Sequence, residues 1–310
     1  MAQKGQGRKI AIIGASGQVG KPTVNTLISN GGHTITALQR PEATSAFPSE
    51  VIVKKGNLED ETFLTDALTG QDAVVLMPPL SLLAKLQEPA IRAAAKVGVP
   101  YVFPSEFGPD PFAGKLVEEN GLLVAKKKIR NLIEELGVSS WVSIAVGPWL
   151  DDGLKGGLWG IDYKARKVTL WRGADAKVST TSIAHAAEAV AAVLSLPEAD
   201  LARYKNKAVY TPSFHLTQRD ILEAVQRATG TTDADWDIRV RDVKDVENEY
   251  EEKIKHGDGV APYVKFFVTH FLQGHGGDFQ NKVDVVELEK LEKLGLQRES
   301  LEQAIKKGLQ

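Results

Sequence analysis

The sequence predicts an α/β protein built on a doubly wound parallel sheet of the Rossmann type, with a smaller C-terminal α/β part that binds the substrate. Short apolar runs alternate with segments of helical periodicity through the first half of the chain, as expected for a parallel sheet covered by helices on both faces. The first run, residues 9–13, leads into a glycine-rich turn and then a helical stretch. This order of strand, turn and helix is typical of a dinucleotide-binding unit.

The glycine-rich turn has the pattern G-x-x-G-x-x-G over residues 14–20. Gly14 permits the tight turn, Gly17 lets the backbone approach a pyrophosphate, and Gly20 lets the helix pack closely on the strand. The phosphates would face the positive end of the helix dipole. An ordinary glycine-rich loop is the alternative interpretation. The residues of the turn that we expect to bind the cofactor are Gly14, Ser16, Gly17, Gln18, Val19 and Gly20.

The end of the second strand indicates which dinucleotide binds. This strand is predicted over residues 33–38 and is followed by Gln39, Arg40 and Pro41. An acidic residue at this corner would bind the ribose 2′-hydroxyl of NAD, and none stands there. The planar guanidinium of Arg40 suits the 2′-phosphate of NADP instead. The sequence therefore favours NADPH, the alternative being a surface arginine before a proline.

The remaining elements follow from apolar runs of strand length and from the 3.6-residue periodicity of helices. Four further strands are predicted at Val51–Lys54, Ala73–Met77, Tyr101–Phe103 and Trp141–Val146. Helices are predicted between them at Leu58–Leu68, Leu82–Val97 and Leu122–Leu136, the last closed by Gly137. The pattern then changes to a hairpin at Lys167–Arg172 and helices at Ile183–Leu194, Thr217–Ala228 and Tyr263–Leu272. We expect a nucleotide-binding domain over 1–150 and a substrate-binding part over 151–310, some segments of which return to the first.

Composition excludes several other classes of protein. The 310 residues carry a formal net charge of -2, which gives no reason to expect nucleic acid or an anionic membrane as partner. Cysteine is absent, so disulfides, thiolate catalysis and cysteine-based zinc sites are excluded. His270, His275 and Asp278 fit no common zinc spacing, and we expect no metal. No apolar run approaches the roughly 18 residues that span a membrane, so we expect a cytoplasmic protein that acts on a small molecule. The sequence leaves open whether the protein forms a homodimer.

Ligands of doubly wound sheets bind at the carboxyl ends of the strands, so the residues that follow each strand are candidate site residues. Asn57 could contact the adenine, or could simply cap the next helix. Trp149 could form a wall for a planar substrate, or could belong to the core, and the same holds for Trp159, Trp171, Phe266, Phe267 and Phe271. We expect contacts to the cofactor from Asn57, Met77, Pro78 and Phe103, and contacts to the substrate from Glu106, Phe107 and Trp149.

Three consecutive lysines in the helix predicted over residues 122–136 are separated by helical geometry. Lys126 lies about 20° from Ile133 on a helical wheel, at the edge of the apolar face. Lys127 points to the opposite side and Lys128 to a polar flank. A lysine at the edge of a cleft can lose its charge by desolvation and act as a general acid or base. The alternative is a surface lysine whose stem covers the core.

These motifs together resemble the NmrA-like, isoflavone-reductase-like group of atypical short-chain dehydrogenases over roughly residues 9–154. The resemblance rests on the glycine turn, Arg40, VPYVFPSEFG at 99–108 and AKKKIRNLIEELGV at 125–138. In the plant reductases of the group the first lysine of K-x-K-[IV]-R is catalytic, and it falls on Lys126. The resemblance thus implies that NADPH supplies a hydride while Lys126, which also borders the cofactor, assists proton transfer. The segment 109–111, Pro-Asp-Pro, departs from the plant pattern, and the segment 147–154 is more similar to that of fungal-type members of unassigned substrate.

Two functions therefore remain. The first is an NADPH-dependent reductase that transfers a hydride to a small, aromatic carbonyl or conjugated substrate, with Lys126 as general acid or base. The second is a non-catalytic redox sensor of the NmrA regulator type, which binds NAD(P) and changes its affinity for a partner protein. The lysine at position 126 favours the enzyme.

Overall fold

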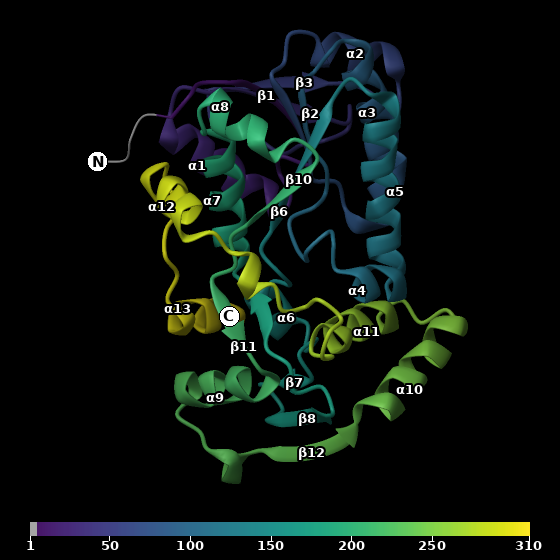
Figure 1. Ribbon diagram of the computed structural model, residues 1–310, viewed down its shortest axis with the longest axis vertical. Coiled ribbons are helices and arrows are strands. Elements are labelled where there is room, and N and C mark those ends of the chain that lie inside the picture. Colours follow the sequence, from purple (N-terminus) through teal and green to yellow (C-terminus); the bar gives the residue numbers. More distant parts are fainter. Residues whose placement is uncertain (1–4) are drawn as a thin grey trace.

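The computed structural model describes residues 5–310 and contains a seven-stranded parallel sheet in the order β10-β6-β5-β4-β1-β2-β3 (Figure 1). β1 and β4 are neighbours, and the chain builds the sheet outward in opposite directions from this pair. In such a sheet the ligand-binding crevice lies at the carboxyl ends of these two strands. The predicted doubly wound fold is confirmed. The strands are β1 (Lys9–Ile13), β2 (Thr34–Gln39), β3 (Val51–Lys55), β4 (Ala73–Leu76), β5 (Tyr101–Phe103), β6 (Ser140–Ala145) and β10 (Lys207–Tyr210).

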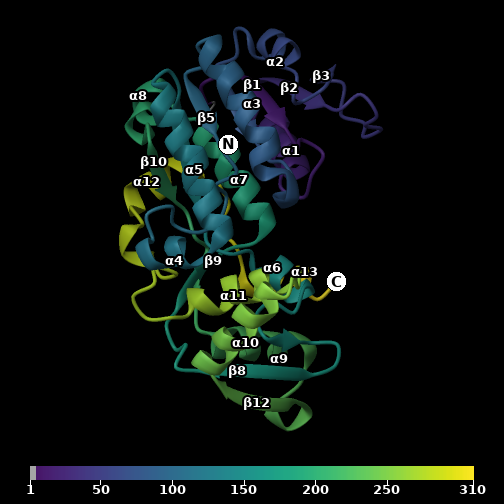
Figure 2. The same cartoon turned by 90° about the vertical axis from the view of Figure 1, so that its right-hand side faces the viewer.

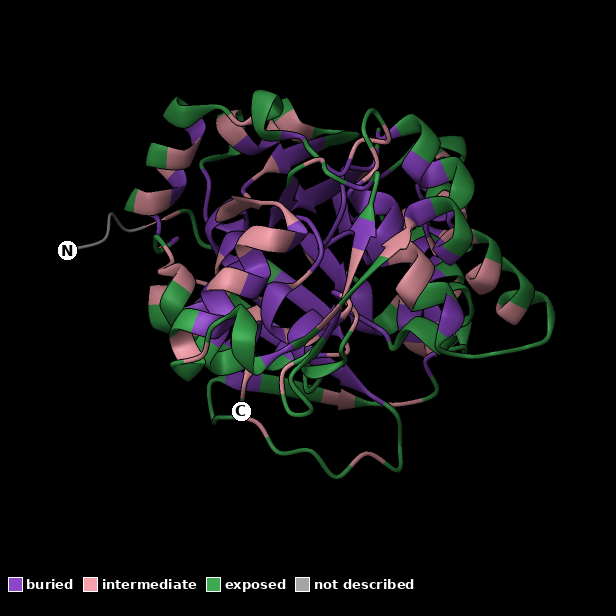
Figure 3. Cartoon of the chain, turned by 90° about the horizontal axis from the view of Figure 1, so that it is seen from below, coloured by how far each residue is buried: buried purple, intermediate pink, exposed green. Residues whose placement is uncertain are grey.

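Helices cover both faces of this sheet, as Figures 1 and 2 show. One face packs against α1 (Gly20–Asn30) and α7 (Ile183–Leu194), which also contact each other. The other face packs against α2 (Glu61–Leu68), α3 (Leu83–Lys96) and α5 (Gly121–Leu136). The strands between these two layers form the buried interior that is purple in Figure 3.

Helix boundaries differ from the predicted ones where a capping side chain decides them. Helix α2 begins at Glu61 rather than at Leu58, because the side chain of Asp60 accepts a hydrogen bond from the backbone of Thr62. Leu58 is still buried, in the turn before the helix. Gly137 ends α5 in the left-handed conformation, with φ of 66°, as the sequence predicts. Capping therefore shifts the ends of elements without changing their order.

The C-terminal part contains a small sheet, and the predicted hairpin at Lys167–Arg172 is wrong. That segment is one strand, β8 (Lys167–Arg172), which pairs antiparallel with β7 (Ile161–Asp162) and parallel with β12 (Asp237–Asp242). The turn of the hairpin therefore lies before β8, where Arg166 adopts a positive φ of 51°. Strand β12 carries alternating charges and is largely exposed, so it lacks the apolar signal that would have predicted it.

Aromatic residues and helices build a separate core in this part. Trp159 makes edge-to-face contacts with Phe267 and Phe271, at centroid distances of 4.6 and 5.7 Å. The indole of Trp171 lies in the same buried cluster. The alternative interpretation of these side chains, core packing rather than substrate contact, is therefore the correct one. The elements around them are α6 (Leu150–Lys155), α9 (Gln218–Thr229), α10 (Val243–Lys255), α11 (Ala261–His270), α13 (Leu301–Gly308) and the ribbon of β9 (Val178–Thr180) and β11 (Phe214–Leu216).

Several segments beyond residue 150 belong to the first sheet. Strand β10 pairs with β6 at its edge, and α7 covers one of its faces. The helices α8 (Glu198–Leu201) and α12 (Val285–Lys293) lie at the same end of the molecule (Figure 1). The division at residue 150 stays a prediction. No helix within residues 5–310 combines the length and apolar character that crossing a membrane requires.

Candidate active site

A cavity of about 720 Å³ lies at the carboxyl ends of the central strands. It is bordered by the glycine turn after β1, the ends of β2 and β4, the loop after β5, and helices α5 and α6. The structure thus brings together most of the residues that sequence analysis selected. Those in the lining are Gly14, Ser16, Gly17, Gln18, Val19, Arg40, Met77, Pro78, Phe107, Lys126 and Trp149.

Each glycine of the turn has a distinct structural role. Gly14 has φ of +84°, and a Cβ built there would lie 2.0 Å from the carbonyl oxygen of Met77. A Cβ at Gly20 would lie 2.1 Å from the carbonyl oxygen of Gly14, so Gly20 serves helix packing and stands outside the cavity lining. A Cβ at Gly17 would meet only the carbonyl oxygen of Gly14, at 3.1 Å, and would otherwise occupy open space. The turn therefore forms a cradle beside the N-terminus of α1 that suits a pyrophosphate.

The corner after β2 contains both a cation and an acid. Arg40 is exposed and forms an ion pair with Glu42 at 3.3 Å, and both residues line the cavity. Glu42 was not predicted as a site residue, because it lies two positions beyond Arg40 and not directly after the strand. A 2′-phosphate would compete with the Glu42 carboxylate for the guanidinium.

Gln39, the last residue of β2, provides a second indication of a nucleotide. Its amide nitrogen donates a hydrogen bond to the carbonyl oxygen of Ser45 at 3.1 Å. Its amide oxygen is buried and has no hydrogen-bond partner in the part of the chain that the structure describes. Buried acceptors are normally satisfied, and Gln39 lines the cavity. A ribose hydroxyl is a suitable donor, so the residues present fit a dinucleotide.

Lys126 is buried in the wall of the cavity, with 7% of its surface exposed, whereas Lys127 and Lys128 are exposed. The helical wheel predicts this separation. Burial lowers the pKa of Lys126, the neighbouring charge of Arg130 lowers it further, and Glu106 opposes the shift. A lysine with a lowered pKa can exchange a proton near neutral pH more readily than an ordinary lysine.

Glu106 is not part of the cavity lining, which corrects the expectation that it contacts the substrate. Its carboxylate forms a buried ion pair with Arg130, one helical turn after Lys126. Its neighbour Phe107 does line the cavity. The indole nitrogen of Trp149 donates to the carbonyl oxygen of Phe107 at 2.9 Å, so the two aromatic residues form one wall.

Asn57 and Phe103 also lie outside the lining. The Asn57 side chain accepts a hydrogen bond from the backbone of Glu59 at 3.0 Å and stabilises the turn before α2. Phe103 is fully buried in the core. Asp152, which was not among the predicted site residues, lines the cavity from α6 and accepts a hydrogen bond from Gln18. Its position three residues after Trp149, in the segment following β6, was the available signal.

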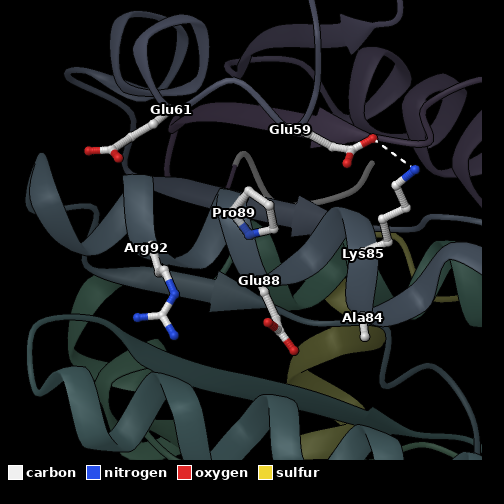
Figure 4. A pocket seen from close by; sticks show the side chains of 7 residues that line it. All are labelled: Glu59, Glu61, Ala84, Lys85, Glu88, Pro89 and Arg92. Atoms are coloured by element: carbon white, nitrogen blue, oxygen red, sulfur yellow. Dashed lines mark ion pairs between the residues drawn. The ribbon is translucent and has the colours of Figure 1, made fainter.

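A second hollow, of about 430 Å³, lies between the start of α2 and α3 (Figure 4). Its lining is mostly charged, and Glu59 pairs with Lys85 across it at 3.1 Å. None of the lining side chains is buried, so we assign it no function. Within residues 5–310 no group of three or more histidines, aspartates or glutamates is arranged to hold a metal ion.

Comparison with known proteins identifies the family. The model of the NmrA-like family matches residues 6–266. The chain belongs to the NmrA-like family. Oxidoreductase aprR from Aspergillus flavus is 27% identical over 278 residues, covering 87% of this chain and 90% of that protein. The isoflavone reductase homolog IRL from Zea mays is 28% identical over 240 residues, covering 72% of this chain and 75% of that protein.

The fold of this NmrA-like protein also matches solved structures, among them an isoflavone reductase, with a TM-score of 0.74 at 21% identity over 97% of this chain and 99% of that one. AtPrR2, in a structure with NADP⁺ and (+)-pinoresinol, superposes with a TM-score of 0.75 at 20% identity, covering 97% of this chain and 99% of that one. The predicted membership of the NmrA-like family is therefore confirmed, and the chain shares the fold of these solved structures.

Proposed function

We propose that this protein is an NADPH-dependent reductase that transfers a hydride to a small aromatic carbonyl or conjugated substrate, with Lys126 as general acid or base. The observation that carries the proposal is the position of Lys126, buried in the wall of the same cavity that contains the glycine turn. The oxidoreductase class and the NADP cofactor agree with the named activities and bound cofactors of the relatives.

The residues of the cavity divide between binding and proton transfer. The glycine turn would hold the pyrophosphate, Arg40 the 2′-phosphate, and the amide oxygen of Gln39 a ribose hydroxyl. The bound nicotinamide supplies a hydride. Trp149 and Phe107 form an apolar wall that excludes water from the reacting groups.

Lys126 would deliver the proton that balances the hydride. Addition of a hydride to a carbonyl or to a conjugated double bond leaves an anion, and the Lys126 ammonium would protonate it. The lowered pKa makes this ammonium a stronger acid than an exposed lysine. Its neutral form would be recharged from solvent after the product leaves.

Substitution of Lys126 by methionine tests the proposal, because methionine keeps the length of the stem and removes the charge. We expect turnover in an NADPH absorbance assay, on a panel of quinones, aldehydes, enones and phenylpropanoids, to fall by about 10² to 10⁴-fold. The affinity for NADPH, measured by calorimetry, should change far less, because the glycine turn and Arg40 are untouched.

Lys127→Met is the matched control. Lys127 is exposed on the opposite side of α5, so this substitution should leave turnover unchanged. Turnover that survives Lys126→Met would refute the role of this residue. A wild-type protein that binds NADPH and NADP⁺ with different effects on a partner, yet reduces nothing in the panel, would instead support the sensor function.

A further inference from the structure

Lys126 is the only lysine among the residues that line the cavity of about 720 Å³ at the strand ends. Its side chain is buried, and within residues 5–310 it forms neither an ion pair nor a hydrogen bond. The other charged groups of this lining have partners, because Arg40 is paired with Glu42 and Asp152 accepts a hydrogen bond from Gln18. Cysteine is absent from the chain, so the Lys126 amine is the strongest nucleophile in the cavity.

The surroundings of Lys126 disfavour its charged form. Burial removes the ammonium from water, and the guanidinium of Arg130, one turn later on α5, repels it. The nearby carboxylate, that of Glu106, is bound in an ion pair with Arg130. Burial and Arg130 therefore lower the pKa of Lys126, and Glu106 opposes the shift. Desolvation and a neighbouring cation are the two conditions that convert a lysine into a nucleophile.

The rest of the wall favours an uncharged group at this position. Leu82 and Leu86, at the start of α3, line the same cavity, and α3 packs against α5. Phe107 and Trp149 contribute two aromatic rings to the lining. An amine that condenses with an aldehyde becomes an imine, which carries no charge in its unprotonated form. Because an unpaired buried charge is unfavourable, an imine suits the site better than the ammonium of Lys126 does.

We infer that Lys126 is also a covalent binding site for aromatic aldehydes, which it captures as a Schiff base. The amine nitrogen attacks the carbonyl carbon, both of its hydrogens leave with the carbonyl oxygen as water, and a C=N bond replaces the C=O bond. Nothing is oxidised or reduced, so the step needs no NADPH. The rings of Phe107 and Trp149 suit an aromatic aldehyde. The inference goes beyond the proposed reductase function, since capture requires no turnover.

Chemical trapping of the imine tests the inference. The full chain is incubated with 2-naphthaldehyde at neutral pH, sodium cyanoborohydride reduces the imine to a stable secondary amine, and peptide mass spectrometry identifies the labelled lysines. Lys127 and Lys128 are internal controls, because both are exposed neighbours on α5. We expect Lys126 to be labelled at least about 10-fold faster than either, because more of it is the neutral amine. Equal or slower labelling of Lys126 would overturn the inference.

Two further measurements separate capture in the cavity from the ordinary reactivity of lysines. In urea that unfolds the chain, the three consecutive lysines should be labelled at similar rates, because the preference depends on the tertiary structure. Lys126→Met should remove the rapidly labelled site, and Lys127→Met should retain it. A rapidly labelled site that persists in Lys126→Met would assign the capture to another amine and refute the role of Lys126.

The pH dependence of labelling reports whether the neutral amine is the reacting form. Labelling of Lys126 should increase with pH and reach half of its limit at a lower pH than an ordinary lysine does, because burial lowers its pKa. Glu106 raises this pKa, so labelling at neutral pH should be faster in Glu106→Gln and return toward the wild-type rate in Glu106→Gln/Arg130→Met. The same rate in all three proteins would contradict the activation of Lys126 by its surroundings, and with it the inference.

The trapping experiment also separates this inference from the proposed function, because it is carried out without NADPH. A protein that is labelled at Lys126 but reduces no compound in the panel supports the covalent site and contradicts the reductase. A reductase whose Lys126 is not labelled contradicts the covalent site alone.

Discussion

The carboxylate of Glu106 forms an ion pair with the guanidinium of Arg130, and both side chains are almost fully shielded from solvent. Arg130 also donates to the carbonyl oxygen of Pro111 at 3.0 Å and lies over the ring of Trp141. Lys126 precedes Arg130 by one turn of α5. The three ionisable groups thus comprise two cations and one anion, and the anion is bound to Arg130. This arrangement leaves Lys126 as the cation that most readily gives up its proton.

Replacing Glu106 by glutamine should change the pH dependence of turnover. Glu106 raises the pKa of Lys126, so loss of its charge should lower that pKa further. If the ammonium is the proton donor, activity falls as pH rises through this pKa, and the alkaline limb of the kcat profile should move to lower pH in Glu106→Gln.

The double variant Glu106→Gln/Arg130→Met is the control for this shift. It removes both charges, whose effects on the pKa of Lys126 oppose each other, so the alkaline limb should return toward that of the wild type. The double variant also leaves no buried arginine unpaired, a change that commonly lowers the free energy of unfolding by about 3 to 5 kcal/mol. An alkaline limb that stays in place in Glu106→Gln would contradict the coupling between Glu106 and Lys126.

Lys126→Met should alter the pH dependence of stability. The pKa of Lys126 is lowered in the folded protein, so between that value and the ordinary value of 10.5 the unfolded chain binds more protons at this site. The free energy of unfolding of the wild type should therefore rise with pH across this window, relative to Lys126→Met. Urea titrations of both proteins at a series of pH values measure the difference. A constant difference between them would argue against a lowered pKa.

The ion pair between Arg40 and Glu42 should reduce the preference for NADPH over NADH. Arg40→Ala should weaken NADPH binding by about 10-fold, or 1.4 kcal/mol, and change NADH binding little. Glu42→Gln should strengthen NADPH binding by up to about 5-fold, the range of an exposed ion pair. Calorimetric titrations of both cofactors measure these effects. Equal affinities of the wild type for both cofactors would exclude a 2′-phosphate site at Arg40.

The glycines of the turn should respond differently to a side chain. Gly17→Val should abolish cofactor binding and retain the fold, because a Cβ there meets only the carbonyl oxygen of Gly14 at 3.1 Å. Gly14→Ala should destabilise the protein, because its φ of +84° disfavours a side chain and the Cβ would collide with Met77. Thermal unfolding and calorimetry with NADPH distinguish the two outcomes. Normal NADPH binding by Gly17→Val would exclude the turn as the phosphate cradle.

Local patterns were sufficient for the first six strands and for the helices α1, α2, α3 and α5 between them, whereas the short helix at Gly114–Glu119 was not predicted. Each strand is a short apolar run, and each helix shows periodicity, so composition within a few residues specifies the element. The same local geometry correctly separated Lys126 from Lys127 on α5. Strand β12 could not be predicted in this way, because it is polar and exposed and is held by pairing with β8, about 70 positions earlier in the chain.

By itself, the sequence determined the doubly wound fold, the glycine turn and the helix face that carries Lys126, because each depends on interactions between near neighbours in the chain. Only the tertiary structure decided what surrounds Lys126. It placed Glu106 against Arg130 rather than in the cavity and set Glu42 beside Arg40. These relationships join residues that meet only when the chain is folded, since charge pairing and burial depend on packing in three dimensions.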